Sequence, residues 1–577
     1  MLREDADADV QRVYSEALVK ARNPNGLRPV DEKAADAWAF WPMAAVLGAS
    51  GLVMFASAQS RDFWGDEVIA IYTAKQVGLN QVLESMAGLV LHPPLYNYVL
   101  HFWMALAGES ETVVRLPSIL FEVLSILVVF RIGSFVLDRR FGLFLAAMTA
   151  LSPFLILFGS MARWYSLSLL LSLLSVFYFL TITSQAGSKQ FKNWTLYALS
   201  TILLNYTHFL TYSIIAAQNV FHIHRHRRDL RALRNWILCQ VFVLIASFFS
   251  IQSLLTQAIG EASGQAEAVD LANSALSYLV MLLYVPTSFS LGETLLPWDF
   301  LITIPALPLF LLLAVKGGLS LHRVRPEIAW LWFLYAVLAL AFGSVAFDLA
   351  DLPISMISSH LIFIAPLYYS VLAMGIRASR SSRVRFLLSA GIAVVFGLSI
   401  VNLLAQRDFH NPTYRIPWRQ IVSEMSSRIQ EGDVIVSMNE VAFDYYLKRS
   451  VTGVKLLHYD LDNRSYAVYD SRTGDKEPLT PTAFKALVKE AAYPYLWLVT
   501  RDRGARGIVE LGETVRETLR RNHNRVDMML YVKEDPRTVR LKSRLLGRDV
   551  PAYKIWVERY QKKSADGAMG GSSCQDA

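Results

Sequence analysis

The sequence predicts a polytopic α-helical membrane protein with about eleven spans, followed by a soluble α/β domain in the last third of the chain. Three observations lead to this fold class. Hydrophobic residues make up 54% of the 577 residues. They gather in runs of about twenty residues between positions 38 and 405, and each run can cross roughly 30 Å of hydrocarbon as a helix. Beyond position 406 the charges return, and short β-rich segments alternate with helical ones.

The spans follow from the apolar runs and from the basic loops between them. The runs 194–206 and 207–222 can also form one long helix, which would reverse the sidedness of all later spans. Charge favours two spans, because the basic stretches at 222–234 and 377–385 then lie on the cytoplasmic side. The predicted spans are 38–58, 113–137, 141–158, 164–183, 194–206, 207–222, 235–256, 298–316, 328–347, 360–376 and 386–405.

The two ends of the chain are expected on opposite sides of the membrane. Residues 1–37 are polar and lack the apolar core of a signal peptide, so the first span is expected to stay uncleaved, with the amino terminus inside. The outer loops then include 257–297 and 348–359, which contain neither Lys nor Arg. The net charge of +8 lies largely in the inner loops and does not indicate a nucleic-acid partner. The two cysteines, Cys239 and Cys574, imply no disulfide.

The segments beyond the last span predict a small α/β domain at 406–560. Before it, residues 1–37 form a cytoplasmic segment and 38–405 form the membrane domain; after it, 561–577 form a disordered tail. No glycine-rich loop that would bind a nucleotide phosphate is present. The predicted strands are 434–438, 454–458, 496–500 and 528–532, and the predicted helices are 419–430, 481–492 and 507–521.

The outer loop 59–112 is the first candidate for a functional site. Two adjacent carboxylates, Asp66 and Glu67, follow the first span closely and are preceded by Phe63 and Trp64. Asp66 equally fits the N-cap of a helix that begins near Glu67, since Asp is a favoured N-cap residue. Capping would not exclude a catalytic role.

A second motif in this loop runs from His92 through two prolines to Tyr96. Two consecutive prolines fix a rigid, extended segment before an aromatic helix. On composition alone, a loop-to-helix connection is favoured, with His92 and Tyr96 as anchors at the membrane interface.

Arg163 lies between two tightly spaced spans, just before Tyr165. An arginine at the outer end of a hydrophobic hairpin is costly unless it is paired or faces water. Its planar fork suits phosphate recognition, but snorkelling to the interface explains it equally well. His208 and His360, at span ends, are more often interfacial polar residues than ligands. Arg115, at the head of the second span, fits an anchor or a partner for a nearby carboxylate.

These polar residues share one property. Under the predicted topology they all lie at the outer membrane face, where they could form a single polar cavity. Such a site suits a substrate with a lipid tail in the bilayer and a charged phosphate at its rim. The residues are Asp66, Glu67, His92, Arg163, His208 and His360.

The order of the motifs resembles the C superfamily of glycosyltransferases, on the branch that holds the bacterial lipid A aminoarabinose transferase and the protein O-mannosyltransferases. The resemblance covers residues 40–500. The chain departs from it at His360-Leu361, where relatives often carry Arg-Tyr. The matching pieces are Trp64-Gly-Asp66-Glu67, His92-Pro-Pro-Leu-Tyr96, Arg115-Leu-Pro-Ser118, Ala162-Arg163-Trp164-Tyr165, Tyr206-Thr-His208, Ser359-His360-Leu with Pro366, and Trp418-Arg419 with Gly432-Asp433.

The resemblance implies that the chain transfers a sugar from a polyprenyl-phosphate donor to an acceptor hydroxyl at the outer face, with inversion of configuration. Asp66 would be the general base. Arg163, helped by Arg115, Lys75 or His360, would stabilise the leaving phosphate, and Trp64 would help to line the sugar site. The residues implied to bind substrate are Glu67, His92, Tyr96, Arg115, Arg163, Tyr165, His208 and His360.

The resemblance also implies a place in the bacterial cytoplasmic (inner) membrane, with the carboxyl-terminal domain in the periplasm or outside the cell. The acceptor would be a glycolipid, a polysaccharide or a protein. No cofactor is required by such a reaction. A divalent metal is not expected to be essential, because no His/Cys cluster has the spacing of metal ligands.

Two other classes of protein stay open on sequence alone. A transporter or flippase of a lipid-linked sugar would share the topology and the polar outer site. Such a site usually lies near the midplane between broken helices, and the predicted spans lack paired interruptions. A membrane-anchored binding or assembly protein would act through its outer domain and would leave the membrane carboxylates and Arg163 unexplained.

Overall fold

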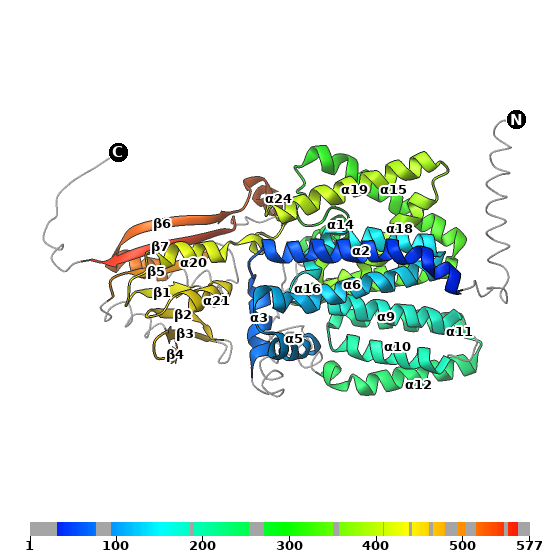
Figure 1. Ribbon diagram of the computed structural model, residues 1–577, viewed down its shortest axis with the longest axis horizontal. Coiled ribbons are helices and arrows are strands. Elements are labelled where there is room, and N and C mark those ends of the chain that lie inside the picture. The colour runs from blue at the N-terminus through cyan, green and yellow to red at the C-terminus, as the bar shows by residue number, and fades with distance from the viewer. Residues whose placement is uncertain are drawn as a thin grey trace.

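The molecule has two parts along its long axis: a bundle of long, roughly parallel helices and a sheet flanked by helices at one end of that bundle (Figure 1). The computed structural model describes residues 32–76, 94–184, 190–252, 271–349, 357–407, 409–437, 441–460, 465–478, 480, 493–501, 515–546 and 552–563. The predicted segments 1–37 and 561–577 therefore lie mostly outside the described residues, as does Cys574.

Among the described residues, six helices of the bundle are long and apolar enough to cross a membrane. A bent pair, α7 (Arg139–Ala150) and α8 (Pro153–Gly159), adds a seventh span if its 63° bend is counted within one crossing. The bend has a local cause, because Ser152 caps α8 and Pro153 occupies its first turn. The six helices are α2 (Glu32–Ser60), α6 (Glu111–Val136), α9 (Tyr165–Ser184), α15 (Phe300–Val324), α16 (Pro326–Leu349) and α19 (Ser382–Leu404).

Shorter helices complete the bundle. A multi-pass helical membrane protein is confirmed, but the count of eleven spans stays a prediction, because helices such as α10, with 16 residues, are shorter than the roughly 20 residues a span needs. A short turn separates α10 from α11, so that 194–222 is not one helix. The shorter elements are α10 (Gln190–Asn205), η1 (Phe209–Thr211), α11 (Tyr212–His226), α12 (Leu230–Ala246), α17 (Ile357–His360), η3 (Ile362–Ile364) and α18 (Ala365–Arg377).

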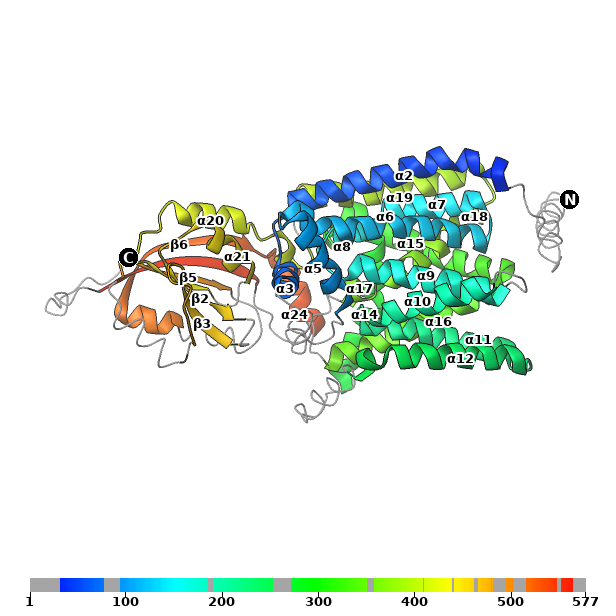
Figure 2. The same cartoon turned by 60° about the horizontal axis from the view of Figure 1, so that its bottom comes forward.

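Within the described ranges, three helices lie in segments assigned to outer loops, and the two in loop 59–112 match the helices expected near Glu67 and after the two prolines. The loop 257–297 contains α14 (Leu271–Leu291), which packs against α8, α17 and a helix of the sheet part. From the sequence this segment was assigned to an outer loop, and the helix was not predicted. Loop 59–112 folds into α3 (Gly65–Lys75) and α5 (Leu95–Ala107). Both views place α3 between the bundle and the sheet (Figure 1 and Figure 2).

In the part of the chain that the structure describes, the sheet has seven strands in the order β4-β3-β2-β1-β5-β7-β6. β1 pairs in parallel with β2 and β5, whereas the other neighbours are antiparallel. The four predicted strands are β1, β2, β5 and β6, and the sequence missed β3, β4 and β7. The strands are β1 (Val434–Ser437), β2 (Lys455–Asp460), β3 (Ser465–Asp470), β4 (Lys476–Pro478), β5 (Leu496–Arg501), β6 (His523–Lys533) and β7 (Lys554–Lys562).

Helices α20 (Trp418–Ser426), α21 (Val441–Ser450) and α24 (Pro536–Leu546) belong to the sheet part, and η4 (Pro412–Arg415) leads into it. The predicted helix 419–430 corresponds to α20. Of the predicted helix 507–521, residues from 515 onward are described and helical, and 481–492 lies outside the described residues. The domain boundaries at 406 and 560 stay predictions.

Candidate active site

The site is built on the first turn of α3, where Asp66 and Glu67 lie next to each other. Acidic residues suit this position because the helix dipole is positive there. The N-cap is Trp64 rather than Asp66, and the Trp64 backbone N–H donates to Glu67 Oε2 at 3.3 Å. The capping role considered for Asp66 is therefore filled by Trp64 and Glu67. The Asp66 side chain is 38% exposed.

Asp66 pairs with Arg163, which comes from the turn between α8 and α9. Arg163 Nη2 lies 3.1 Å from Asp66 Oδ2, and Arg163 Nη1 donates to the Asp66 backbone carbonyl at 3.3 Å. The Arg163 side chain is only 8% exposed, so it is held in place while Asp66 stays accessible. An accessible carboxylate and a buried guanidinium are thus in direct contact at the end of the bundle.

Glu67 has a different environment from its neighbour. Its side chain is fully buried and accepts two hydrogen bonds from Arg115, from Nε and Nη2, both at 2.8 Å. The Ala162 backbone N–H donates to Glu67 Oε1 at 2.9 Å. Burial alone would raise the pKa of Glu67, but the charge and hydrogen bonds of Arg115 outweigh it, so the pKa lies below its ordinary value. Glu67 is therefore an ion that is already fully paired.

Arg115 is as buried as its partner. Its other N–H groups donate to the backbone carbonyls of Ala58, Arg61 and Asp62 at 2.5, 2.9 and 3.1 Å. All of these carbonyls lie at the end of α2 or just beyond it. The buried Glu67–Arg115 pair therefore ties three segments together: the exit of the first span, the start of α3 and the Ala162 turn.

Tyr96 is connected to the Arg163 backbone through Ser118. The hydroxyl of this buried residue lies 2.8 Å from Ser118 Oγ, and Ser118 Oγ donates to the Arg163 backbone carbonyl at 3.3 Å. Ser118 lies three residues after Arg115 on α6, on the same side of the helix. One face of α6 thus holds both the Glu67 carboxylate and the Arg163 backbone.

An aromatic cluster flanks the ion pair. The rings of Trp164 and His208 stack with centroids 3.8 Å apart, and the His360 ring lies 5.3 Å from that of His208. Tyr165 hydrogen-bonds with the side chains of Arg163 and Ser359. His208 Nδ1 accepts the backbone N–H of Leu210 at 3.2 Å, which fixes the ring at the start of η1.

The structure thus gathers most of the residues predicted for the site around Arg163. Asp66, Tyr165, His208 and His360 are linked to it directly or through Trp164. Glu67, Arg115 and Tyr96 form a buried layer behind it. His92 lies outside the described residues. Among the residues that are described, no group of three or more His, Cys, Asp or Glu side chains could hold a metal ion.

The sequence did not indicate that the sheet part contacts the irregular segment just before Asp66. The Tyr446 hydroxyl accepts the Phe63 backbone N–H at 2.9 Å. Arg419 bonds Asp62 through its side chain and through its backbone N–H, the latter at 2.8 Å. The Tyr414 ring meets the Trp64 ring edge-on with centroids 4.9 Å apart. These partners lie more than 300 positions apart, so no local pattern could reveal them.

A second missed group surrounds Glu293, whose carboxylate is fully buried. It accepts hydrogen bonds from Tyr284 at 2.8 Å, from Ser358 at 3.2 Å and from Ser288. His410 Nδ1 lies 3.5 Å from Glu293 Oε2. Because Ser358 precedes Ser359 and His360, this network connects α14 and the segment leading into the sheet with the aromatic cluster.

Comparisons with known proteins show similarity in sequence and in fold. Residues 91–252 match the family model described as dolichyl-phosphate-mannose-protein mannosyltransferase. No curated protein sequence matches the chain. Among solved structures, ArnT from Cupriavidus metallidurans in the apo state superposes with a TM-score of 0.50 at 13% identity, covering 91% of this chain and 98% of that one.

Two further structures are similar. ArnT from the same organism bound to undecaprenyl phosphate gives a TM-score of 0.49 at 13% identity, covering 91% and 98% of the two chains. The archaeal oligosaccharyltransferase AglB from Archaeoglobus fulgidus, in complex with an inhibitory peptide and a dolichol-phosphate, gives 0.40 at 12% identity, covering 76% and 74%.

The bundle with its appended sheet has the same overall fold as ArnT, and together with the family match over residues 91–252 this indicates a membrane glycosyltransferase. The segment that matches the family model includes α5, α6, Arg163 and His208.

Proposed function

We propose that the protein transfers a sugar from a polyprenyl-phosphate donor to an acceptor hydroxyl at the outer face of the membrane, with inversion at the anomeric carbon. The Asp66–Arg163 pair carries this proposal, because it places an accessible carboxylate against a buried guanidinium. The name of the matched family, dolichyl-phosphate-mannose-protein mannosyltransferase, supports a lipid-linked donor.

In the proposed reaction Asp66 accepts the proton of the acceptor hydroxyl as that oxygen attacks the anomeric carbon. The bond from the sugar to the phosphate oxygen breaks, and the lipid phosphate leaves with that electron pair. Arg163 stabilises the developing negative charge. Binding of the donor phosphate draws Nη2 of Arg163 away from Asp66 Oδ2, which frees the carboxylate to act as the base.

Glu67 and Arg115 are assigned a positioning role in this proposal. Neither side chain is exposed, and each satisfies the charge of the other, so direct contact with the acceptor or with the leaving phosphate is not supported. Glu67 also has a lowered pKa, which makes it a weaker base than an ordinary glutamate. The pair fixes the turn that presents Asp66.

The aromatic cluster supports a sugar site beside the ion pair. Tyr165 is hydrogen-bonded to Arg163, and the Trp164 ring contacts the rings of both His208 and His360. We assign Tyr165, His208 and His360 to the donor sugar. The acceptor is a glycolipid, a polysaccharide or a protein, no metal is assigned a role, and the site faces the periplasm of a bacterial inner membrane.

Transfer of radiolabelled sugar from a panel of synthetic polyprenyl-phosphate sugars tests this function. Purified wild-type protein and Asp66→Asn are compared, with membrane extract as the source of acceptors. Loss of a general base typically lowers the rate about 10²–10⁴-fold, and Asp66→Asn is expected to show a loss of this size with an unchanged melting temperature. Turnover by Asp66→Asn at the wild-type rate would refute its assignment as the base.

A flippase of lipid-linked sugar is the second candidate, and the same panel separates it from the enzyme. In sealed proteoliposomes a flippase moves the labelled donor to the other leaflet without cleaving the bond between sugar and phosphate. A transferase releases free polyprenyl phosphate in proportion to the labelled product. Translocation of intact donor with no released lipid phosphate would favour the flippase.

A further inference from the structure

The end of the bundle away from the sheet contains an open, basic cavity between α11 and α16. Its volume is about 490 Å³, within the roughly 300–1,000 Å³ of typical ligand sites. Figure 2 shows both helices side by side in the bundle, with α11 extending to its far end. The lining residues are Phe221, His224, Arg225, Arg227, Arg228, Pro326, Glu327 and Trp330.

The charges of this cavity are unbalanced. Three arginines and a histidine line it, and Glu327 is the one carboxylate among the lining residues. Glu327 forms an ion pair with Arg225. Basic residues at the end of α11 also interact favourably with the helix dipole. The dipole alone does not explain why they line a cavity that α11 forms with α16. Arg227 and Arg228 bring planar guanidinium groups, which match the oxygens of a phosphate.

An apolar stripe continues from the cavity along α16. The rings of Trp330 and Phe333 stack with centroids 5.6 Å apart, and their exposed fractions are 42% and 56%. Val337 and Val345 are also exposed and lie on the same side of the helix by their spacing. Because α16 is a candidate membrane span, this stripe faces the acyl chains of the bilayer.

We propose that this cavity is a binding site for an anionic phospholipid. The phosphate lies between Arg227 and Arg228, and one acyl chain runs over Trp330 and along the α16 stripe. The combination of a basic cavity and a continuous apolar track favours a lipid over a soluble phosphate compound. In the predicted topology this end faces the cytoplasmic leaflet, whose anionic lipids attract basic groups. The proposal does not depend on the reaction at the other end of the bundle.

Thermal unfolding of the purified full-length chain in neutral detergent tests the site. Phosphatidylglycerol is expected to raise the melting temperature in a concentration-dependent way, because it binds the folded state, whereas phosphatidylcholine is not. The variant Arg227→Gln/Arg228→Gln is expected to bind phosphatidylglycerol at least about tenfold more weakly, since it loses two basic contacts. The control Arg323→Gln/Arg380→Gln is expected to behave as wild type.

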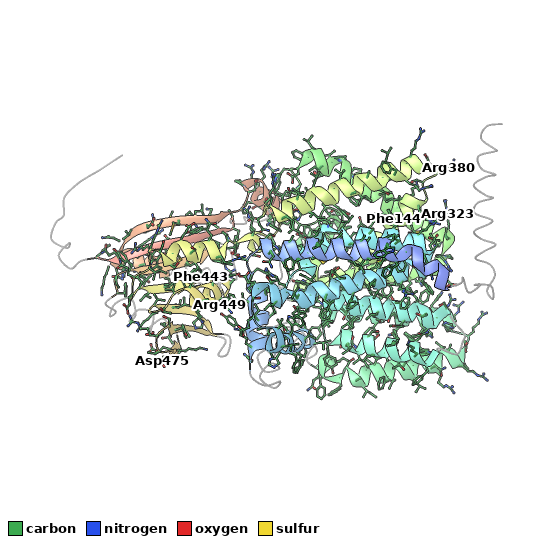
Figure 3. All side chains as sticks on the ribbon, viewed as in Figure 1. Phe144, Arg323, Arg380, Phe443, Arg449 and Asp475 are labelled. Atoms are coloured by element: carbon green, nitrogen blue, oxygen red, sulfur yellow. The ribbon has the colours of Figure 1, made fainter. Side chains whose placement is uncertain are left out.

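The control is matched to the test variant. Arg323 and Arg380 lie at the same end of the bundle (Figure 3), outside the cavity, and their replacement removes the same net charge. An equal loss in the control would overturn the site and indicate general charge attraction. A full shift from inorganic phosphate alone would overturn the lipid assignment. Trp330→Ala provides a second variant, and wild-type affinity for phosphatidylglycerol in both site variants would refute the proposal.

Discussion

Asp66 and Glu67 are adjacent carboxylates with opposite environments. Asp66 is partly exposed and forms an ion pair with Arg163, whereas Glu67 is buried and accepts hydrogen bonds from Arg115 through both of its carboxylate oxygens. A pair of carboxylates with separate environments can divide two tasks between them. Here the geometry supports proton transfer for the first and positioning for the second.

Glu67→Gln is predicted to destabilise the protein. Removing one member of a buried ion pair leaves the other charge unpaired and typically costs about 3–5 kcal/mol. A lower melting temperature in detergent is therefore expected, together with a loss of turnover as the turn before Asp66 loosens. The double variant Glu67→Gln/Arg115→Met, which leaves no buried charge, should unfold at a higher temperature than Glu67→Gln. Additive losses in the double variant would contradict the pairing.

At the scale of elements, α15 and α18 pack so closely that their backbones touch. A Cβ atom at Gly317 would lie 1.8 Å from the Val371 carbonyl oxygen, and one at Gly375 would lie 2.3 Å from the Leu313 carbonyl oxygen. Backbone atoms of two long helices cannot move aside as a side chain can. Glycine at these positions therefore sets the distance between the helices, as small residues often do in membrane bundles.

Gly317→Ala is predicted to lower the melting temperature, with a cost of about 1–3 kcal/mol or more from overpacking. Gly318→Ala is the matched control, because a Cβ there meets nothing within 4 Å. Alanine is the better helix former by about 1 kcal/mol, so the control should be neutral or slightly stabilising. Equal melting temperatures for the two variants would show that α15 and α18 are not in close contact.

The sheet part holds the segment before Asp66 through α20 and α21. Arg419, in α20, bonds Asp62, and Tyr446, in α21, accepts the backbone N–H of Phe63. Surface ion pairs contribute little to stability. The main effect of Arg419 is therefore expected on the position of the segment that carries Asp62 and leads to Asp66. Small misplacements at a reacting centre can cost up to about 10²-fold in rate.

Arg419→Gln is accordingly predicted to lower kcat several-fold while leaving the melting temperature nearly unchanged. Arg428→Gln is the control, because Arg428 pairs with Asp527 inside the sheet part at 2.9 Å and is similarly exposed. Steady-state kinetics with a donor from the panel compares the two. If both variants lose kcat equally, the sheet part does not act through Asp62.

At the scale of the whole molecule, sidedness follows from the number of crossings. The amino terminus and the sheet part lie on opposite sides only if that number is odd. Alkaline phosphatase fused after residue 577 is predicted to be active in a bacterial host, and the same enzyme fused within 225–234 is predicted to be inactive. A fluorescent protein that folds only in the cytoplasm should give the opposite pattern. Activity at both positions would mean that the predicted spans before 225 are miscounted.

Much of the architecture was accessible from the sequence because its physical basis is local. The apolar runs and the basic loops predicted a multi-pass bundle, and β-rich segments predicted four strands of the sheet. Helix α14, by contrast, was not predicted, and it packs against α8, α17 and α24. The order of short motifs along the chain also indicated the superfamily.

From the sequence by itself we predicted the class of protein and expected Asp66, Arg163, His208 and His360 at one membrane face, because hydrophobicity and charge indicate which loops share a side. Only the tertiary structure decided how these residues divide their roles. Glu67 is paired with Arg115, 48 positions away, and Trp64 packs on Tyr414 from the segment leading into the sheet. Such contacts depend on how segments distant in the sequence pack together. The same packing buries Glu67 and leaves Asp66 partly exposed.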